Sequence, residues 1–153
     1  MPVIDPATDE VNFTPTSSVA GSITGIEFYR AAGDNGPDIA QLWSSTGTLL
    51  ASGTFSNTSA SGWQTVTFSS PVAITAGTTY VASYHSTGAY AATSNYFTSA
   101  HTNGSLTALS STASSGNGVY TYGGTSTTGL LPTNSYQASN YWVDVVFNPQ
   151  LTS

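Results

Sequence analysis

The chain has 153 residues and a formal net charge of −6, with a single Lys or Arg against seven Asp or Glu. Phosphate binding needs several cations, so this balance argues against a nucleic-acid-binding protein and against binding to an anionic membrane surface. Without cysteine, the chain forms neither disulfides nor thiolate metal sites. A neutral partner or a divalent cation is compatible with the charge, and no apolar run approaches the ~20 residues of a membrane-spanning helix.

Alternating apolar residues mark the predicted strands in the first part of the chain. Residues 22–30 form the first strand, in which Ile26 and Phe28 share one face. Residues 39–43 and 48–55 are joined by a short polar turn. This arrangement predicts a β-hairpin.

Three further strands complete the predicted fold. Residues 63–68 and 79–85 alternate in the same way, and residues 141–147 form the last strand. Strands separated by turns at intervals of about 8–12 residues predict an all-β fold, an antiparallel β-sandwich of jelly-roll-like form with long loops between the later strands. We assign residues 1–9 to an N-terminal tail, residues 10–148 to a single domain and residues 149–153 to a C-terminal tail.

Several motifs follow one another in an order that resembles a known family. They are GSITGIEFY at 21–29, QLW at 41–43, GTLLA at 47–51, GWQTVTF at 62–68, PVAITAGTTYVASYH at 71–85, GNGVY at 116–120 and NYWVDVVF at 140–147. Together they resemble a bacterial extracellular domain family of unknown function, the DUF4082-type β-sandwich found in large secreted multidomain proteins. The resemblance implies an extracellular or cell-surface location and an accessory role beside immunoglobulin-like, cadherin-like and carbohydrate-active modules. It supplies no catalytic residue and no ligand.

Catalytic constellations are weak in this sequence. His85 or His101 with Asp144 and one of the many serines offers the members of a Ser-His-Asp triad, but no nucleophile-elbow motif is present. A glycosidase needs two carboxyls facing one cleft. The acidic residues here are spread over the N-terminal tail, one loop and two strands. We therefore expect a protein that is not an enzyme, with a hydrolase as a distant third interpretation.

A calcium site is one interpretation of the acidic loop between the first two predicted strands. Asp34, Asn35 and Asp38 offer oxygen ligands of the kind that calcium prefers. Their spacing is not that of an EF-hand, and the same residue types favour an ordinary turn. The turn is the preferred interpretation, and calcium stays a candidate cofactor. A second acidic group, Asp5, Asp9 and Glu10, is expected in the solvated tail.

Arg30 is the only Lys or Arg in the chain and ends an apolar strand. A buried arginine needs an anionic partner. Glu27 lies three residues away in the same strand and therefore points to the opposite face. Asp144, within the last apolar strand, is the predicted partner.

The stretch 86–140 is rich in Gly, Ser, Thr and Asn and carries dispersed aromatic residues. Aromatic rings stack on the apolar faces of sugars, and exposed aromatics mark interaction sites. The predicted ligand-binding residues are Tyr90, Tyr96, His101, Tyr120, Tyr122 and Tyr136. In the alternative interpretation, these rings pack the loops onto the sandwich as a second small core. The strand aromatics are expected in the main core, namely Trp43, Trp63, Phe28, Phe68, Tyr80 and Phe147.

Two functions remain open at this point. The leading hypothesis is a non-catalytic carbohydrate-binding or adhesion module of a larger secreted protein, with a polysaccharide or surface glycan as its partner. The alternative is a structural spacer or self-associating unit, because strand edges without Lys residues are poorly protected against edge-to-edge pairing.

Overall fold

The computed structural model describes residues 7–15, 21–33, 39–44, 46–55, 61–75, 78–86, 92–103, 106–108, 110, 119–122, 134–135, 137–139 and 141–149. In this part of the chain, every regular element is a β-strand except the short 3₁₀-helix η1, Tyr96–Thr98. No helix among these residues is long and apolar enough to cross a membrane.

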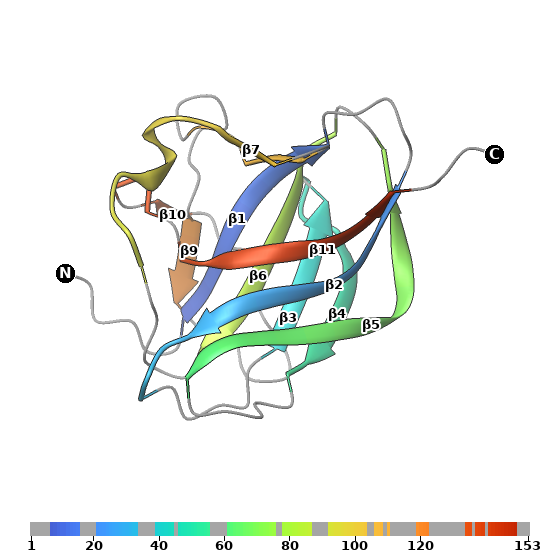
Figure 1. Ribbon diagram of the computed structural model, residues 1–153, viewed down its shortest axis with the longest axis horizontal. Coiled ribbons are helices and arrows are strands. Elements are labelled where there is room, and N and C mark those ends of the chain that lie inside the picture. Colours follow the sequence, from blue (N-terminus) through green and yellow to red (C-terminus); the bar gives the residue numbers. More distant parts are fainter. Residues whose placement is uncertain are drawn as a thin grey trace.

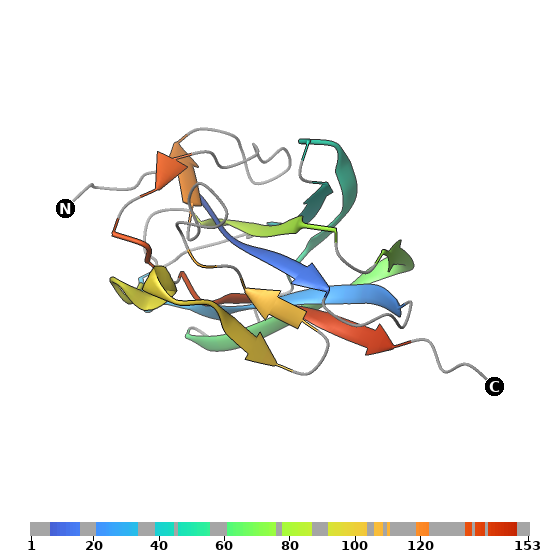
Figure 2. The ribbon, with the colours of Figure 1, turned by 90° about the horizontal axis from the view of Figure 1, so that it is seen from above.

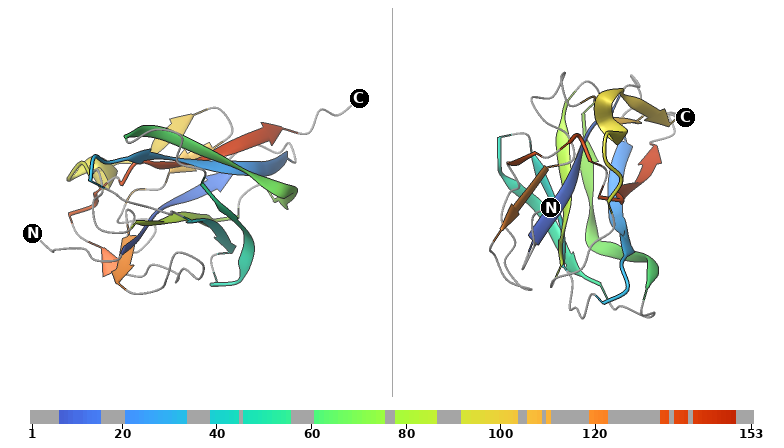
Figure 3. Two further views of the ribbon diagram at one scale, coloured as in Figure 1. Left: turned by 90° about the horizontal axis from the view of Figure 1, so that it is seen from below. Right: turned by 90° about the vertical axis from the view of Figure 1, so that its left-hand side faces the viewer.

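Two antiparallel sheets pack face to face as the layers of a sandwich, as Figures 2 and 3 show. The strands are β1 Ala7–Pro15, β2 Gly21–Arg30, β3 Ile39–Ser44, β4 Leu49–Thr54, β5 Gly62–Ile74, β6 Tyr80–Ser86, β7 His101–Asn103, β8 Leu106–Ala108, β9 Val119–Tyr122, β10 Asn134–Ser135 and β11 Val143–Pro149. The larger sheet has the order β10-β9-β1-β6-β3-β4, with β8 paired to β1 and β7 to β8. The smaller sheet has the order β11-β2-β5, and its strands cross those of the larger sheet steeply (Figure 1).

This arrangement confirms the predicted all-β antiparallel sandwich. It adds strand β1 at the N-terminal end and the short strands β7 to β10 within the stretch 86–140, which we expected to form long loops. We expected residues 1–9 to form a tail, whereas β1 begins at Ala7. The strand forms because its backbone has partners on both sides, with β6 along one edge and β8 and β9 along the other. Asp9 and Glu10, expected in solvated tail, are paired with Tyr84 and Ser83 in the β1–β6 ladder.

The central strand of the smaller sheet, β2, contains a β-bulge. The pairing of β2 with both neighbours shifts next to Thr24, so that Ile23 and Ile26 both face the core although they are three residues apart. Gly25 fits here because a Cβ atom at this position would collide with the carbonyl oxygen of Val66 on β5. Beyond the bulge, Ile26 and Phe28 alternate inward as the sequence predicts.

The core lies between the two sheets and joins them through aromatic contacts. Phe28 of the smaller sheet stacks on Tyr84 of the larger one with ring centroids 4.4 Å apart, and it also meets Phe55 at 4.7 Å. The Tyr84 hydroxyl donates to the carbonyl oxygen of Tyr141 at 3.1 Å, which ties the approach to β11 onto the larger sheet. Other buried members are Ile23, Ile26, Ala40, Leu42, Phe68, Ile74, Tyr80, Ala82, Phe97, Val143 and Val145.

The strands β3 and β6 are buried on both faces. Their core-facing residues alternate with a second set that is also buried although it points away from the core. This set consists of Ile39, Gln41, Trp43, Val81, Ser83 and His85. Within it, Trp43 Nε1 donates to Ser83 Oγ at 2.9 Å. His85, a member of the hypothetical catalytic triad, is buried and only 2% exposed.

Candidate functional site

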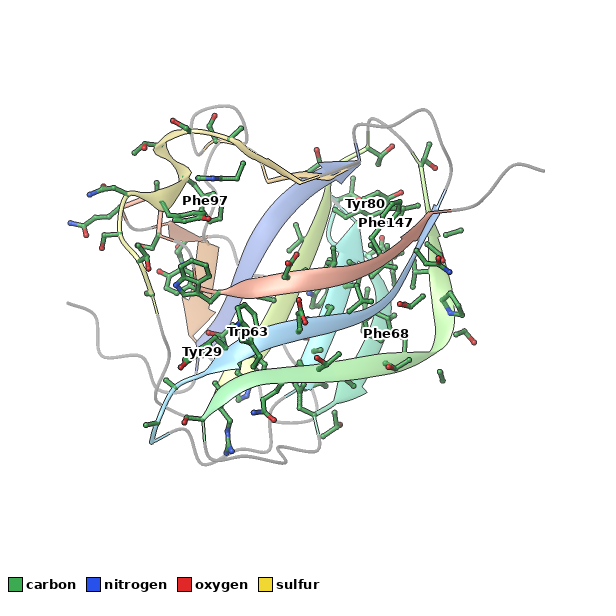
Figure 4. The ribbon with its side chains drawn as sticks, in the orientation of Figure 1. Tyr29, Trp63, Phe68, Tyr80, Phe97 and Phe147 are labelled. Carbon is green, nitrogen blue, oxygen red and sulfur yellow. The ribbon has the colours of Figure 1, made fainter. Side chains whose placement is uncertain are left out.

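Two aromatic side chains stand exposed on the outer surface of the smaller sheet. Tyr29 on β2 and Trp63 on β5 are cross-strand partners, and their rings meet edge to face with centroids 5.8 Å apart. Trp63 is 51% exposed and Tyr29 is 40% exposed. Figure 4 shows both near one end of this sheet. Each points outward because it is out of phase with the core residues of its own strand, Phe28 and Phe68.

A third aromatic residue, the half-buried Trp142, lies next to this pair just before the C-terminal strand. The backbone N–H of Tyr29 donates to the carbonyl oxygen of Trp142 at 2.9 Å, so Trp142 is next to Tyr29 at the start of β11. Its indole N–H donates to Thr93 Oγ1 at 3.0 Å. Its ring meets that of Tyr96, with centroids 5.3 Å apart. Trp142 thus connects the sheet surface to the segment around η1.

Tyr96 and His101 complete the row. Their rings stack with centroids 4.1 Å apart and an interplanar angle of 17°. His101 Nε2 is 2.8 Å from the carbonyl oxygen of Tyr96, and the His101 side chain is exposed. Because Tyr96 is half-buried between Trp142, Phe97 and His101, it supports the row and His101 provides the outer ring. We call the five residues Trp63, Tyr29, Trp142, Tyr96 and His101 the aromatic strip.

Two residues in or next to the aromatic strip have unusual backbone conformations. Trp142 has a φ of 57° and Asn95 a φ of 61°. A bulky residue such as tryptophan adopts positive φ only at a cost of about 1–2 kcal/mol, which the surrounding contacts must offset. Two backbone hydrogen bonds, from Asn95 N to the Gln137 carbonyl and from Phe97 N to the Ala138 carbonyl, hold η1 against the segment before β11. Such strain is typical of functional sites.

Two carboxylates form the next row on the same outer surface. Asp144 on β11 is paired with Glu27 on β2, and Glu27 is paired with Thr65 on β5. Glu27 lies two residues before Tyr29 along β2, which places this row about 7 Å from the Tyr29–Trp63 pair. Burial raises the pKa of Glu27, the charge of Asp144 raises it further, and a hydrogen bond with Thr65 opposes both effects.

The environment of Asp144 differs from that of Glu27. Its side chain is exposed at the surface, yet the atoms packed around the carboxyl raise its pKa, against a hydrogen bond in which Oδ1 accepts from Val145 N at 2.8 Å. The two carboxyls are cross-strand neighbours, so each one titrates in the presence of the other. Like charges directly opposite each other on neighbouring strands are destabilising.

The predicted pairing of Arg30 with Asp144 is wrong. Arg30 is 7% exposed and alternates with Phe28 toward the core side of β2. Asp144 shares the outer surface with Glu27, so the two side chains point to opposite faces of the smaller sheet. The strand alternation that excluded Glu27 as a partner excludes Asp144 as well, because cross-strand partners share a face.

The structure brings two of the predicted ligand-binding residues together, Tyr96 and His101. Tyr120 and Tyr122 lie on β9, where their backbones pair with Asp9 and Ala7 of β1. The remaining predicted residues lie outside the described part of the chain, namely Tyr90, Tyr136 and the calcium candidates Asp34, Asn35 and Asp38. Among the described residues, no three His, Asp or Glu side chains come together as a metal site requires.

Sequence reasoning missed the other three members of the aromatic strip. Trp63 was expected in the core and is exposed, because its place in the alternation is that of Thr65 and Thr67 rather than that of Phe68. Tyr29 is likewise out of phase with the core-facing Phe28 on its own strand. Trp142 had no usable signal, since positive φ interrupts the alternation just before β11.

An antiparallel β-sandwich with an exposed aromatic pair on the outer surface of its smaller sheet is the class of domain that these observations define. The chain belongs to a family described as a domain of unknown function, DUF4082, whose model matches residues 5–143. This match confirms the family resemblance of the sequence motifs. No curated protein and no solved structure matches the chain.

Proposed function

We propose that this protein is a non-catalytic carbohydrate-binding module of a larger secreted protein, and that it binds polysaccharide through the aromatic strip. The exposed Tyr29–Trp63 pair carries the proposal, because side chains of this size are normally buried and their exposure on a sheet surface needs a reason. Sugar rings present apolar C–H faces that stack on aromatic rings.

The surroundings of the pair suit a neutral hydroxylated ligand. Carboxylate oxygens of Glu27 and Asp144 and the hydroxyl of Thr65 lie one row away as hydrogen-bond partners for sugar hydroxyls. His101 offers a further ring and a polar nitrogen at the other end of the aromatic strip. An open sheet surface with several rings in a row fits a long chain better than a small molecule, which would need an enclosing pocket.

Retention on immobilised polysaccharides tests this proposal, with the variant Trp63→Ala. Trp63 is 51% exposed, and a sugar that covers one face of a ring of ~250 Å² would remove ~60 Å² of it from water, worth ~1.5 kcal/mol or about tenfold in affinity. Leu49→Ala is the matched control, because it removes an exposed apolar side chain from the other sheet. Loss of retention in the Trp63 variant alone supports the proposal. Equal retention of the Trp63 variant and the native protein, or no retention of the native protein on any polysaccharide, contradicts it.

A self-associating structural unit is the second candidate, and strand β4 favours it. Within the described residues β4 ends the strand order of the larger sheet, and Leu49 and Leu50 are both exposed on it. An edge strand with adjacent exposed leucines and no lysine is a template for pairing with a second copy. Concentration-dependent light scattering that disappears in Leu49→Lys and persists in Trp63→Ala would favour this function. A monomer at all concentrations would contradict it.

A further inference from the structure

We infer that the Tyr29–Trp63 pair and the Glu27–Asp144 pair together bind a polysaccharide that carries ammonium groups, that is, a polymer of amino sugars. The inference rests on the proposed function and names the ligand class of the same surface. It starts from the position of the two pairs in adjacent rows of one three-stranded sheet. The aromatic rings supply the stacking surface, and the carboxylates supply the charge.

The charge around this surface is one-sided. The chain contains a single Lys or Arg, Arg30, and that side chain is buried on the core side of β2. No Lys or Arg side chain is therefore available at the surface to neutralise Glu27 and Asp144. The aromatic strip contains one histidine, His101. It lies beyond Trp142 and Tyr96, at the end of the aromatic strip that is farther from Glu27 and Asp144.

An ammonium group can interact both with the exposed aromatic rings and with the uncompensated carboxylates. A cation over the face of Trp or Tyr is attracted by the ring, and a carboxylate about 7 Å further along the strand accepts its hydrogen bonds. A neutral sugar stacks on the rings and offers only hydroxyl hydrogen bonds to the carboxylates, which leaves their charge uncompensated, and an acidic sugar is repelled by them. The amino polymer is thus the ligand whose charge complements the whole surface.

The electrostatic destabilisation caused by the carboxylate pair also supports a cationic ligand. Glu27 and Asp144 are cross-strand neighbours of like charge, and both lie in surroundings that favour their neutral forms. Proteins break such local rules mainly where function requires it. A bound cation between the two carboxylates would remove the repulsion, so the ligand would supply the positive charge that the free protein lacks at this position.

Chemically matched polymers test this inference. Affinity electrophoresis compares polyglucosamine with protonated amino groups and poly-N-acetylglucosamine, which has the same backbone without the charge. We expect the native protein to bind the amino polymer about five- to tenfold more tightly. The double variant Glu27→Gln and Asp144→Asn should bind both polymers equally.

Controls separate this site from non-specific attraction by the net charge. Asp5→Asn with Asp9→Asn removes the same two charges from other parts of the chain and should keep the preference for the amino polymer. If this variant loses the preference as well, or the Glu27 and Asp144 variant keeps it, the inference is overturned. Equal binding of both polymers by the native protein overturns the inference and leaves the proposed function standing. Binding of neither these two polymers nor any neutral polysaccharide contradicts both.

Discussion

The cross-strand pair of Glu27 and Asp144 makes the stability of this protein depend on pH in a defined direction. The test uses Glu27→Gln, Asp144→Asn and the double variant. These amides keep the shape of the side chains, and an amide oxygen at position 144 still accepts from Val145 N. The substitutions thus remove charge and leave the packing unchanged.

The magnitude follows from the register. Directly opposite side chains have Cβ atoms about 5 Å apart, and two unit charges at that distance in a water-like dielectric repel by about 0.8 kcal/mol. Each single variant should gain about 0.5–1 kcal/mol in free energy of unfolding at pH 7, which corresponds to about 1–4 °C in Tm. Because either substitution abolishes the same repulsion, the double variant should gain less than the sum of the two single variants.

The sign of the pH dependence follows from the raised pKa values of both carboxyls. The folded protein keeps their protons to a higher pH than the unfolded chain does, so the free energy of unfolding falls as pH rises from the ordinary carboxyl pKa of about 4 through the raised pKa values. This destabilisation is complete above that window. The gain of the variants should therefore be present at pH 7 and disappear below about pH 4.

Urea denaturation at pH 3.5 and pH 7, each at low and high salt, measures these effects. Salt screens exposed charges, so the gain at pH 7 should shrink as ionic strength rises. The reasoning is refuted if the single variants are no more stable than the native protein at pH 7. It is equally refuted if their gain is unchanged at pH 3.5, or if the two gains add fully in the double variant.

Three further substitutions test the packing, each measured by urea denaturation. Phe28→Ala removes the ring that joins the two sheets through Tyr84 and should cost about 3–5 kcal/mol; a loss below 1 kcal/mol would contradict its central role. Gly25→Ala pushes a methyl group into the Val66 carbonyl and should cost at least about 1–3 kcal/mol, whereas no loss would show that the bulge adapts. Trp43→Phe removes the donor to Ser83 Oγ and should cost about 1 kcal/mol, with non-additivity in combination with Ser83→Ala; full additivity would argue against the hydrogen bond.

Local sequence patterns predicted the strands of the smaller sheet and strands β3, β4 and β6 of the larger one, but not the short strands β7 to β10. The alternation of Ile26 with Phe28 and of Val66 with Phe68 holds because side chains alternate across any strand, whatever its partners are. The predicted strands at 22–30, 39–43 and 79–85 agree with β2, β3 and β6 to within one residue at either end. Strand β1 escaped prediction because its stability comes from two flanking partners and not from its own polar composition.

The candidate site was predictable only in part. Tyr96 and His101 stood out as aromatic residues in a polar stretch, and the structure stacks them on each other. The contact of Tyr96 with Trp142, and the position of Trp142 next to Tyr29, depend on how the C-terminal strand enters the smaller sheet. No local pattern contains that information.

By itself, the sequence determined an all-β chain with an acidic, almost cation-free composition and with motifs of a recognisable family, because composition and alternation are local properties. Tertiary structure decided which residues meet. The pairing of β2 with β11 brings Glu27 opposite Asp144 and places Trp142 next to Tyr29, from nearly opposite ends of the chain. The same pairing separates Arg30 from Asp144, because register assigns each side chain to one face of a sheet and register is set by partners that lie far apart in sequence.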